Sequence, residues 1–221
     1  MREPTLWETI GATNPDRSPW YVERFRAMAA AGDDLAGEAR FVDALVPRGA
    51  RVLDAGCGPR RVGGELVRRG HTVVGVDVDP VLVAAAREDH PGRDWHLGDL
   101  AELDLPAVGV REPFDVAVMA GNVLTFVAPG THVEVLRRVG AHLRDDGRLA
   151  VGFGAGRGYA FEQLTEDAER AGLVVDQRFA TWDLRPFGPT AEFLVALLGR
   201  ADAQRLPGDH ASPPRSTSPY S

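Results

Sequence analysis

The 221-residue sequence contains no lysine and only one cysteine. All 25 basic residues are arginine, which excludes mechanisms that require a lysine amine, among them Schiff-base formation, pyridoxal phosphate catalysis and phosphate binding by a Walker A loop. The single cysteine, Cys57, cannot form a disulfide within the chain. No apolar run approaches the roughly 18 residues of a membrane span, and the start of the chain lacks the basic-then-apolar order of a signal peptide. We therefore expect a cytoplasmic protein with no membrane partner.

Positive charge is also in deficit, because 32 acidic residues outnumber 25 basic ones and give a net charge of −7. Such a chain repels polyanions, so we expect no nucleic-acid partner. Its length and its 44% hydrophobic content are typical of one globular domain. After residue 200 the sequence is rich in proline and serine and has no apolar period. We predict one domain over 1–200 and a disordered tail over 201–221 that is dispensable for folding and ligand binding.

Apolar residues recur at helical spacing over 18–31 and 34–45, which predicts a helical cap of two helices within 18–48. From residue 50, short apolar runs alternate with helical patterns, as is typical of βα units around a parallel sheet. The predicted strands are 51–54, 72–76, 94–97, 115–119, 148–153, 174–182 and 191–198, and the predicted helices are 62–69, 80–88, 132–143 and 160–171. Too few residues join the last two strands for a crossover, so these strands should form an antiparallel hairpin. The sequence therefore predicts an α/β fold with a mostly parallel seven-stranded sheet and helices on both faces.

The first two predicted strands end in residues suited to ligand binding. The first ends in the glycine-rich turn from Asp54 to Gly58, where glycines allow the backbone to approach a ligand closely. The second ends at Asp77, a carboxylate that can accept hydrogen bonds from both hydroxyls of a ribose. A strand-end aspartate can also cap the next helix, but Asp79, directly before Pro80, is the better cap. We therefore assign Asp77 to a ligand.

The third predicted strand ends at Gly98 and Asp99, where the carboxylate can accept a hydrogen bond from an adenine amino group. With these three strand ends, the sequence resembles the class I S-adenosylmethionine (SAM)-dependent methyltransferases over about residues 18–198, with weaker motifs at 114–118 and 146–149. The resemblance implies a Rossmann-like fold, SAM (S-adenosyl-L-methionine) as cofactor and methyl transfer to a small-molecule substrate. The cofactor-binding residues that it implies are Asp54, Gly56, Gly58, Asp77, Val78, Asp99 and Leu100.

Candidates for the acceptor site follow the fourth predicted strand, because ligands of such sheets lie beyond the carboxyl ends of the strands. Asn122 can orient the acceptor or the cofactor, or it can cap a turn. Thr125 belongs to the same segment, and His132 is the one histidine close enough to test as a base. On the first predicted helix, Tyr21 and Arg24 are candidates for a lid. Arg24 would pair with the methionine carboxylate of the cofactor, whereas core packing explains Tyr21 equally well.

The glycine-rich turn departs from the family pattern at Pro59 and Arg60, where a third glycine is common. Added bulk and a lost backbone donor lead us to expect weak SAM binding, which the double substitution Pro59→Thr with Arg60→Gly should tighten. Two alternatives to a methyltransferase stay open. One is a binding module that has lost turnover, and the other is a nicotinamide-dependent oxidoreductase, which the expected hairpin disfavours. The acceptor atom and the oligomeric state also stay open.

Overall fold

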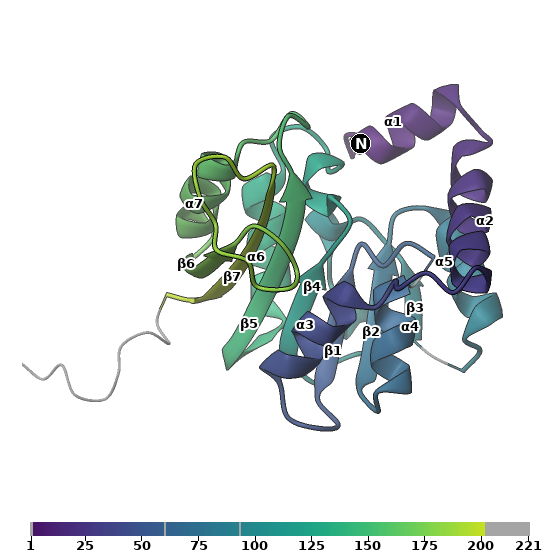
Figure 1. The fold of residues 1–221 in the computed structure, drawn as a ribbon, viewed down its shortest axis with the longest axis horizontal. Coiled ribbons are helices and arrows are strands. Elements are labelled where there is room, and N and C mark those ends of the chain that lie inside the picture. Colours follow the sequence, from purple (N-terminus) through teal and green to yellow (C-terminus); the bar gives the residue numbers. More distant parts are fainter. Residues whose placement is uncertain (1, 60, 93, 202–221) are drawn as a thin grey trace, which may run out of the picture.

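The computed structural model describes residues 2–59, 61–92 and 94–201, and these form one seven-stranded sheet in the order β3-β2-β1-β4-β5-β7-β6 (Figure 1). The strands are β1 (Arg51–Ala55), β2 (Thr72–Asp77), β3 (Asp94–Leu97), β4 (Phe114–Met119), β5 (Leu143–Gly154), β6 (Leu173–Phe179) and β7 (Phe193–Arg200). From β3 to β5 all neighbouring strands are parallel, whereas β7 pairs antiparallel with both β5 and β6. The predicted mixed sheet and its terminal hairpin are confirmed.

Helices cover both faces of the sheet, as predicted (Figure 1). Those that pack on the faces are α3 (Gly37–Leu45), α4 (Arg61–Arg68), α5 (Pro80–Asp89), α6 (His132–Ala141) and α7 (Phe161–Arg170). The first three share one apolar cluster with β1 and β2, and the last two share the other. Burial on both faces explains why the central strands read as continuous apolar runs, such as 116–119 in β4. Packing on both faces therefore fixes the positions of the strand ends.

Two further helices precede these, α1 (Leu6–Thr13) and α2 (Arg17–Ala30). The predicted amino-terminal helices correspond to α2 and α3, so α1 is an addition to the predicted fold. It begins with a capping box in which Thr5 and Glu8 satisfy each other's backbone N–H groups. The backbone N–H of Trp7 donates to the carbonyl of Phe126 (3.3 Å), which follows β4. This bond places α1 at the carboxyl ends of the strands, where Figure 1 shows it joined to α2.

Some predicted boundaries shift. β5 begins at Leu143 rather than at Arg148, with an irregularity in its pairing with β4. β6 ends at Phe179, and Trp182 packs against Phe41 instead, with 5.3 Å between the ring centres. Apart from residue 201, the predicted tail lies outside the described residues. None of the helices described is long and apolar enough to cross a membrane.

Candidate functional site

Two left-handed glycines shape the turn after β1. The φ angle is 82° at Gly56 and 54° at Gly58, a region that side chains rarely adopt. A Cβ on Gly56 would lie 2.4 Å from Cγ2 of Val123, which is closer than real contacts allow. The backbone N–H of Gly56 donates to the carbonyl of Val76 (2.8 Å) and ties the turn to the end of β2. The turn therefore presents its backbone beside the next strand end.

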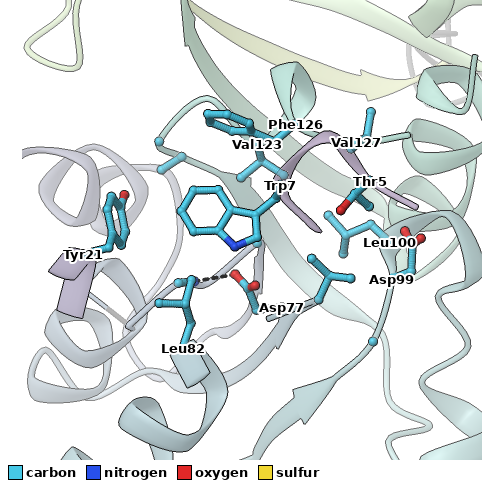
Figure 2. A pocket seen from close by; sticks show the side chains of 16 residues that line it. Thr5, Trp7, Tyr21, Asp77, Leu82, Asp99, Leu100, Val123, Phe126 and Val127 are labelled. Carbon is cyan, nitrogen blue, oxygen red and sulfur yellow. Dashed lines mark hydrogen bonds between the residues drawn. The ribbon is translucent and has the colours of Figure 1, made fainter. Parts of the chain in front are cut away.

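Asp77, the last residue of β2, lines a pocket at the carboxyl ends of the strands, which we call the first pocket (Figure 2). One carboxylate oxygen accepts from the N–H of Gly58 (2.8 Å) and the other from the N–H of Asp79 (2.9 Å). Burial raises the pKa of Asp77 to about 6. Asp79 caps α5 through the N–H of Val81 (2.8 Å), as predicted. Because each carboxylate oxygen has a second lone pair, Asp77 can still accept hydroxyl groups of a ligand.

Asp99 lines the same pocket, but its carboxylate is already engaged. One oxygen accepts from the N–H of Ala101 (2.9 Å) and caps the short turn η1 (Leu100–Glu102), and the other accepts from Arg2 (2.8 Å). Arg2 also pairs with Glu8 of α1 (2.6 Å), so the amino-terminal segment is tied to the third strand end. Of the predicted cofactor residues, the structure brings together around this pocket Tyr21, Gly56, Gly58, Asp77, Val78, Asp99 and Leu100.

The sequence prediction missed the part of the first pocket that α1 supplies. Figure 2 shows the indole of Trp7 in the middle of the residues that line it. Its Nε1–H donates to the carboxylate of Asp79 (2.7 Å), and its ring makes edge contacts with Tyr21 and Phe126, at 5.5 and 5.4 Å between ring centres. The spacing Thr5-x-x-Glu8 was the available signal, because a capping box marks the start of a helix. Trp7 thus forms part of the pocket's wall and ties α1 to the start of α5.

A second pocket shares Tyr21, Gly56 and Gly58 with the first and contains Asp54 in its wall. The Asp54 carboxylate accepts from the N–H of Gly63 (2.8 Å), and burial raises its pKa to about 7. Arg61 lines this pocket too, and its charge opposes the rise in the Asp54 pKa, but its guanidinium pairs with Glu38. A further cation would stabilise the charged form of Asp54, so this pocket suits a positively charged part of a ligand. Pro59 lines it too, whereas Arg60, on which the weak-binding prediction depends, lies outside the described residues.

A third pocket, which we call the arginine pocket, adjoins the other two at Tyr21 and Gly121. Its basic residues are Arg17, Arg24, Arg61 and Arg157, and its aromatic residues are Trp7, Trp20, Tyr21, Phe25 and Phe126. Arg24, predicted to pair with the cofactor, lines this pocket and neither of the other two, with its guanidinium 5.5 Å from the centre of the Trp20 ring. The structure thus places Arg24 apart from the two pockets that contain Asp77 and Asp54.

The three acceptor-site candidates have structural partners. Asn122 lines the arginine pocket, but its φ is 68° and its side-chain oxygen accepts from the N–H of Gly154 (2.8 Å), so it also holds a turn. The Thr125 hydroxyl donates to the carbonyl of Asn122 (2.8 Å) and lines none of the three pockets. His132 is outside them as well, because its ring stacks on Tyr159 with 4.3 Å between centres, and burial lowers its pKa. Of the three candidates, Asn122 alone lines one of these pockets.

The acidic groups of the first two pockets match the polar parts of SAM. Asp77 can accept hydrogen bonds from the ribose hydroxyls, and the negative charge of Asp54 suits the ammonium group. The left-handed glycines bring the backbone of the turn to the edge of both pockets without a side chain between it and a ligand. Leu82, Leu100 and Val123 give the first pocket apolar walls suited to an adenine ring. The residues present therefore fit the cofactor.

The comparisons with known proteins identify the family of this chain. A family profile described as a methyltransferase domain matches residues 52–147. A TehB-like SAM-dependent methyltransferase from Corynebacterium glutamicum, whose crystal structure is known, has 45% sequence identity to this chain. The two structures superpose with a TM-score of 0.79, and the match covers 85% of this chain and 100% of the C. glutamicum chain.

Two curated proteins match over shorter segments. Magnesium-protoporphyrin O-methyltransferase of Rhodobacter capsulatus is 38% identical over 86 residues, which is 37% of this chain and 36% of the relative. Ribosomal protein L11 methyltransferase of Symbiobacterium thermophilum is 35% identical over 133 residues, 58% of this chain and 40% of the relative. The matches thus span well under half of each curated relative. Because the C. glutamicum protein matches over its entire length, this chain belongs to the class I SAM-dependent methyltransferases.

Proposed function

We propose that this protein transfers a methyl group from SAM to a small molecule that binds in the arginine pocket. The observation that carries the proposal is the buried Asp77 carboxylate, which faces the first pocket beside a turn of left-handed glycines. A small acceptor is supported by the pocket's walls, because α1, α2 and the residues between these two helices supply most of its lining and stand beside the strand ends. Of the two curated relatives, one is named for a small-molecule acceptor, magnesium-protoporphyrin.

Bound SAM supplies an electrophilic methyl group, and the residues of this chain bind and orient the reactants. Asp77 and Asp54 hold the two ends of the cofactor in the first and second pockets. Tyr21 and Gly121 lie where all three pockets meet, which is where an acceptor would approach the methyl group. Burial raises the pKa of Tyr21, so its hydroxyl stays protonated near neutral pH and is no base.

The rate acceleration then comes from the alignment of the acceptor with the methyl group of SAM. Alignment of two reactants supplies about 7–11 kcal/mol at best, which suffices for an acceptor that already has a free electron pair. No side chain needs to remove a proton in this scheme. The scheme differs from the sequence-based suggestion of His132 as a base, because that imidazole is stacked on Tyr159 outside the three pockets.

Binding of S-adenosylhomocysteine, the demethylated cofactor, tests the proposal. Asp77→Ala should weaken it at least about tenfold, because hydrogen bonds to a charged group contribute about 1.5–3 kcal/mol. Asp115→Ala is the matched control. Asp115 also accepts from a backbone N–H, that of Arg51 (2.7 Å), but it lies at the opposite end of the sheet and should leave binding unchanged. Calorimetric titration of S-adenosylhomocysteine into the parent and the two variants measures the dissociation constants. Equal values for the parent and Asp77→Ala would mean that Asp77 is not part of the cofactor site.

Turnover needs its own assay, since binding alone is also expected of a module that has lost activity. The purified protein is incubated with methyl-labelled SAM and a small-molecule extract, and label is sought in extractable products. Label transfer that Asp77→Ala reduces and Asp115→Ala does not would support the methyltransferase. Tight cofactor binding without transfer to any fraction would favour the binding module.

A further inference from the structure

The arginine pocket has a charge that is unusual for this chain. Three of its basic residues, Arg17, Arg24 and Arg157, face one acidic residue, Asp16. Three positive charges and one negative charge leave the wall at +2, while the whole chain carries −7. The fourth arginine, Arg61, does not change this sum, because both of its terminal nitrogens bond the carboxylate of Glu38. The positive wall is therefore a local feature against an acidic background.

Within residues 2–59, 61–92 and 94–201, the three remaining arginines, Arg17, Arg24 and Arg157, form no ion pair, although many other arginines of the chain do. The guanidinium of Arg17 lies over the ring of Trp7 at 4.4 Å from its centre. A guanidinium stacked on a ring still presents its N–H edge to an anion. Arg24 likewise lies over Trp20, at 5.5 Å, so Arg17 and Arg24 pack on aromatic rings with their hydrogen-bond donors available.

Helix α2 places its contribution to this wall on one face. Arg17, Trp20, Tyr21 and Arg24 follow the spacing i, i+3, i+4, i+7, which brings them to one side of a helix. Trp20 is 59% exposed, a large apolar surface for a soluble helix. Trp7 and Phe126 also line the pocket, and the Arg17 guanidinium lies over both rings, 4.4 and 5.5 Å from their centres. Such a wall is complementary to a planar apolar body that carries an anionic group.

We infer that the acceptor of this methyltransferase is an organic anion, a carboxylate or similar group on a flat aromatic body. The inference rests on the proposed function, because it assigns the arginine pocket to the acceptor. Arg24 and Arg157 bind the anionic group, and the aromatic side chains pack on the body. The descriptions of the family profile and of the C. glutamicum structure name no acceptor.

Two matched probes separate charge from shape. 2-Naphthoate is a flat aromatic anion, and 2-naphthamide has nearly the same size and no charge. Calorimetric titration of the parent protein, with and without saturating S-adenosylhomocysteine, should show naphthoate binding at least about tenfold more tightly than naphthamide. Equal affinity for the two probes, or no binding of naphthoate in either condition, would overturn the inference.

Single substitutions then locate the site. Arg24→Gln and Arg157→Gln should each reduce the preference for naphthoate at least about threefold and leave naphthamide binding unchanged. Arg48→Gln is the matched control, since it makes the same charge change in a residue that is 82% exposed in the loop between α3 and β1, at the other end of the sheet. A naphthoate preference that Arg48→Gln lowers as much as the other two would place the effect in the overall field and overturn the assignment.

The same titrations distinguish this inference from the proposed function. If S-adenosylhomocysteine binds and naphthoate has no preference over naphthamide, the methyltransferase stands and the anionic acceptor is wrong. If S-adenosylhomocysteine does not bind but the naphthoate preference depends on Arg24 and Arg157, the arginine pocket is an anion site and the proposed function is wrong.

Discussion

Substitution of Asp54 by asparagine should stabilise the fold at alkaline pH while it weakens cofactor binding. Asp54 is 2% exposed, and burial raises its pKa to about 7. For a carboxyl group whose folded-state pKa exceeds its unfolded value, the folded state binds more protons between the two values, so stability falls as the pH rises through that window. At pH 8 the ionised Asp54 therefore destabilises the protein. An amide oxygen can still accept the N–H of Gly63 and carries no charge.

The magnitude follows from the two pKa values. One unit corresponds to about 1.4 kcal/mol, and the folded-state pKa of about 7 exceeds the ordinary aspartate value by roughly three units. Ionised Asp54 thus destabilises the parent at high pH by on the order of 4 kcal/mol, whereas the buried amide destabilises the variant by about 1–3 kcal/mol. The cost of the amide does not depend on pH, so it cancels when the variant and the parent are compared at two pH values. Between pH 5 and pH 8, the difference in free energy of unfolding between variant and parent should shift by about 2–3 kcal/mol in favour of the variant.

Urea unfolding at both pH values, followed by tryptophan fluorescence, measures this shift. Asp115→Asn is the control, because it makes the same carboxyl-to-amide change at the far end of the sheet. Calorimetry on the same samples should show weaker binding of S-adenosylhomocysteine to Asp54→Asn, since an amide cannot neutralise the ammonium group. A difference between Asp54→Asn and parent that is the same at pH 5 and pH 8 would refute the argument, because ionisation of Asp54 would then make no contribution to stability.

Two further substitutions test the walls of the first pocket. Gly56→Ala should lose cofactor binding and destabilise the fold by about 1–3 kcal/mol, because its φ is 82° and its Cβ would lie 2.4 Å from Val123. Adding Val123→Ala should recover part of the stability but not all of it, and chemical denaturation of both proteins shows whether it does. Trp7→Ala should speed dissociation of S-adenosylhomocysteine about tenfold, because edge contacts with two rings contribute about 0.5–1.5 kcal/mol each and hold α1 over the pocket. Stopped-flow displacement measures that rate, and slower dissociation would mean that Trp7 competes with the ligand for space.

The sheet was predictable from the sequence because its strands are buried on both faces and read as short apolar runs between helices. Helix α1 was not, and the reason is physical. None of its residues is buried, so it has no core-facing period to detect. It is held instead by its capping box and by the contacts of Trp7 with Asp79 and Phe126, residues far away in the sequence. Such contacts exist only after the chain has folded.

The candidate site was also predictable in part. Topology alone brings Gly56, Asp77 and Asp99 to one edge, because the carboxyl ends of parallel strands meet there. The positions of the acceptor-site candidates depend on the conformation of the segments after the strands, which the sequence does not reveal. His132 stacks on Tyr159, and the Asn122 side chain accepts a hydrogen bond that stabilises a turn. The arginines of the acceptor side come from α2, α4 and the segment after β5, and arginines on helices usually face water. Of the residues that line the arginine pocket, Tyr21, Arg24 and Asn122 were predicted from the sequence as site residues.

The absence of lysine now has a functional consequence. Arginine stays protonated throughout the physiological range, whereas a lysine beside other cations in a pocket releases its proton readily. The charge of the arginine pocket is therefore constant where Asp54 and Asp77, with pKa values near 7 and 6, change theirs. Falling pH neutralises the wall that faces the cationic cofactor and leaves the wall that faces the acceptor untouched. The two ligands should thus respond differently to acid: cofactor affinity declines below pH 7, while affinity for a permanently charged anion is retained.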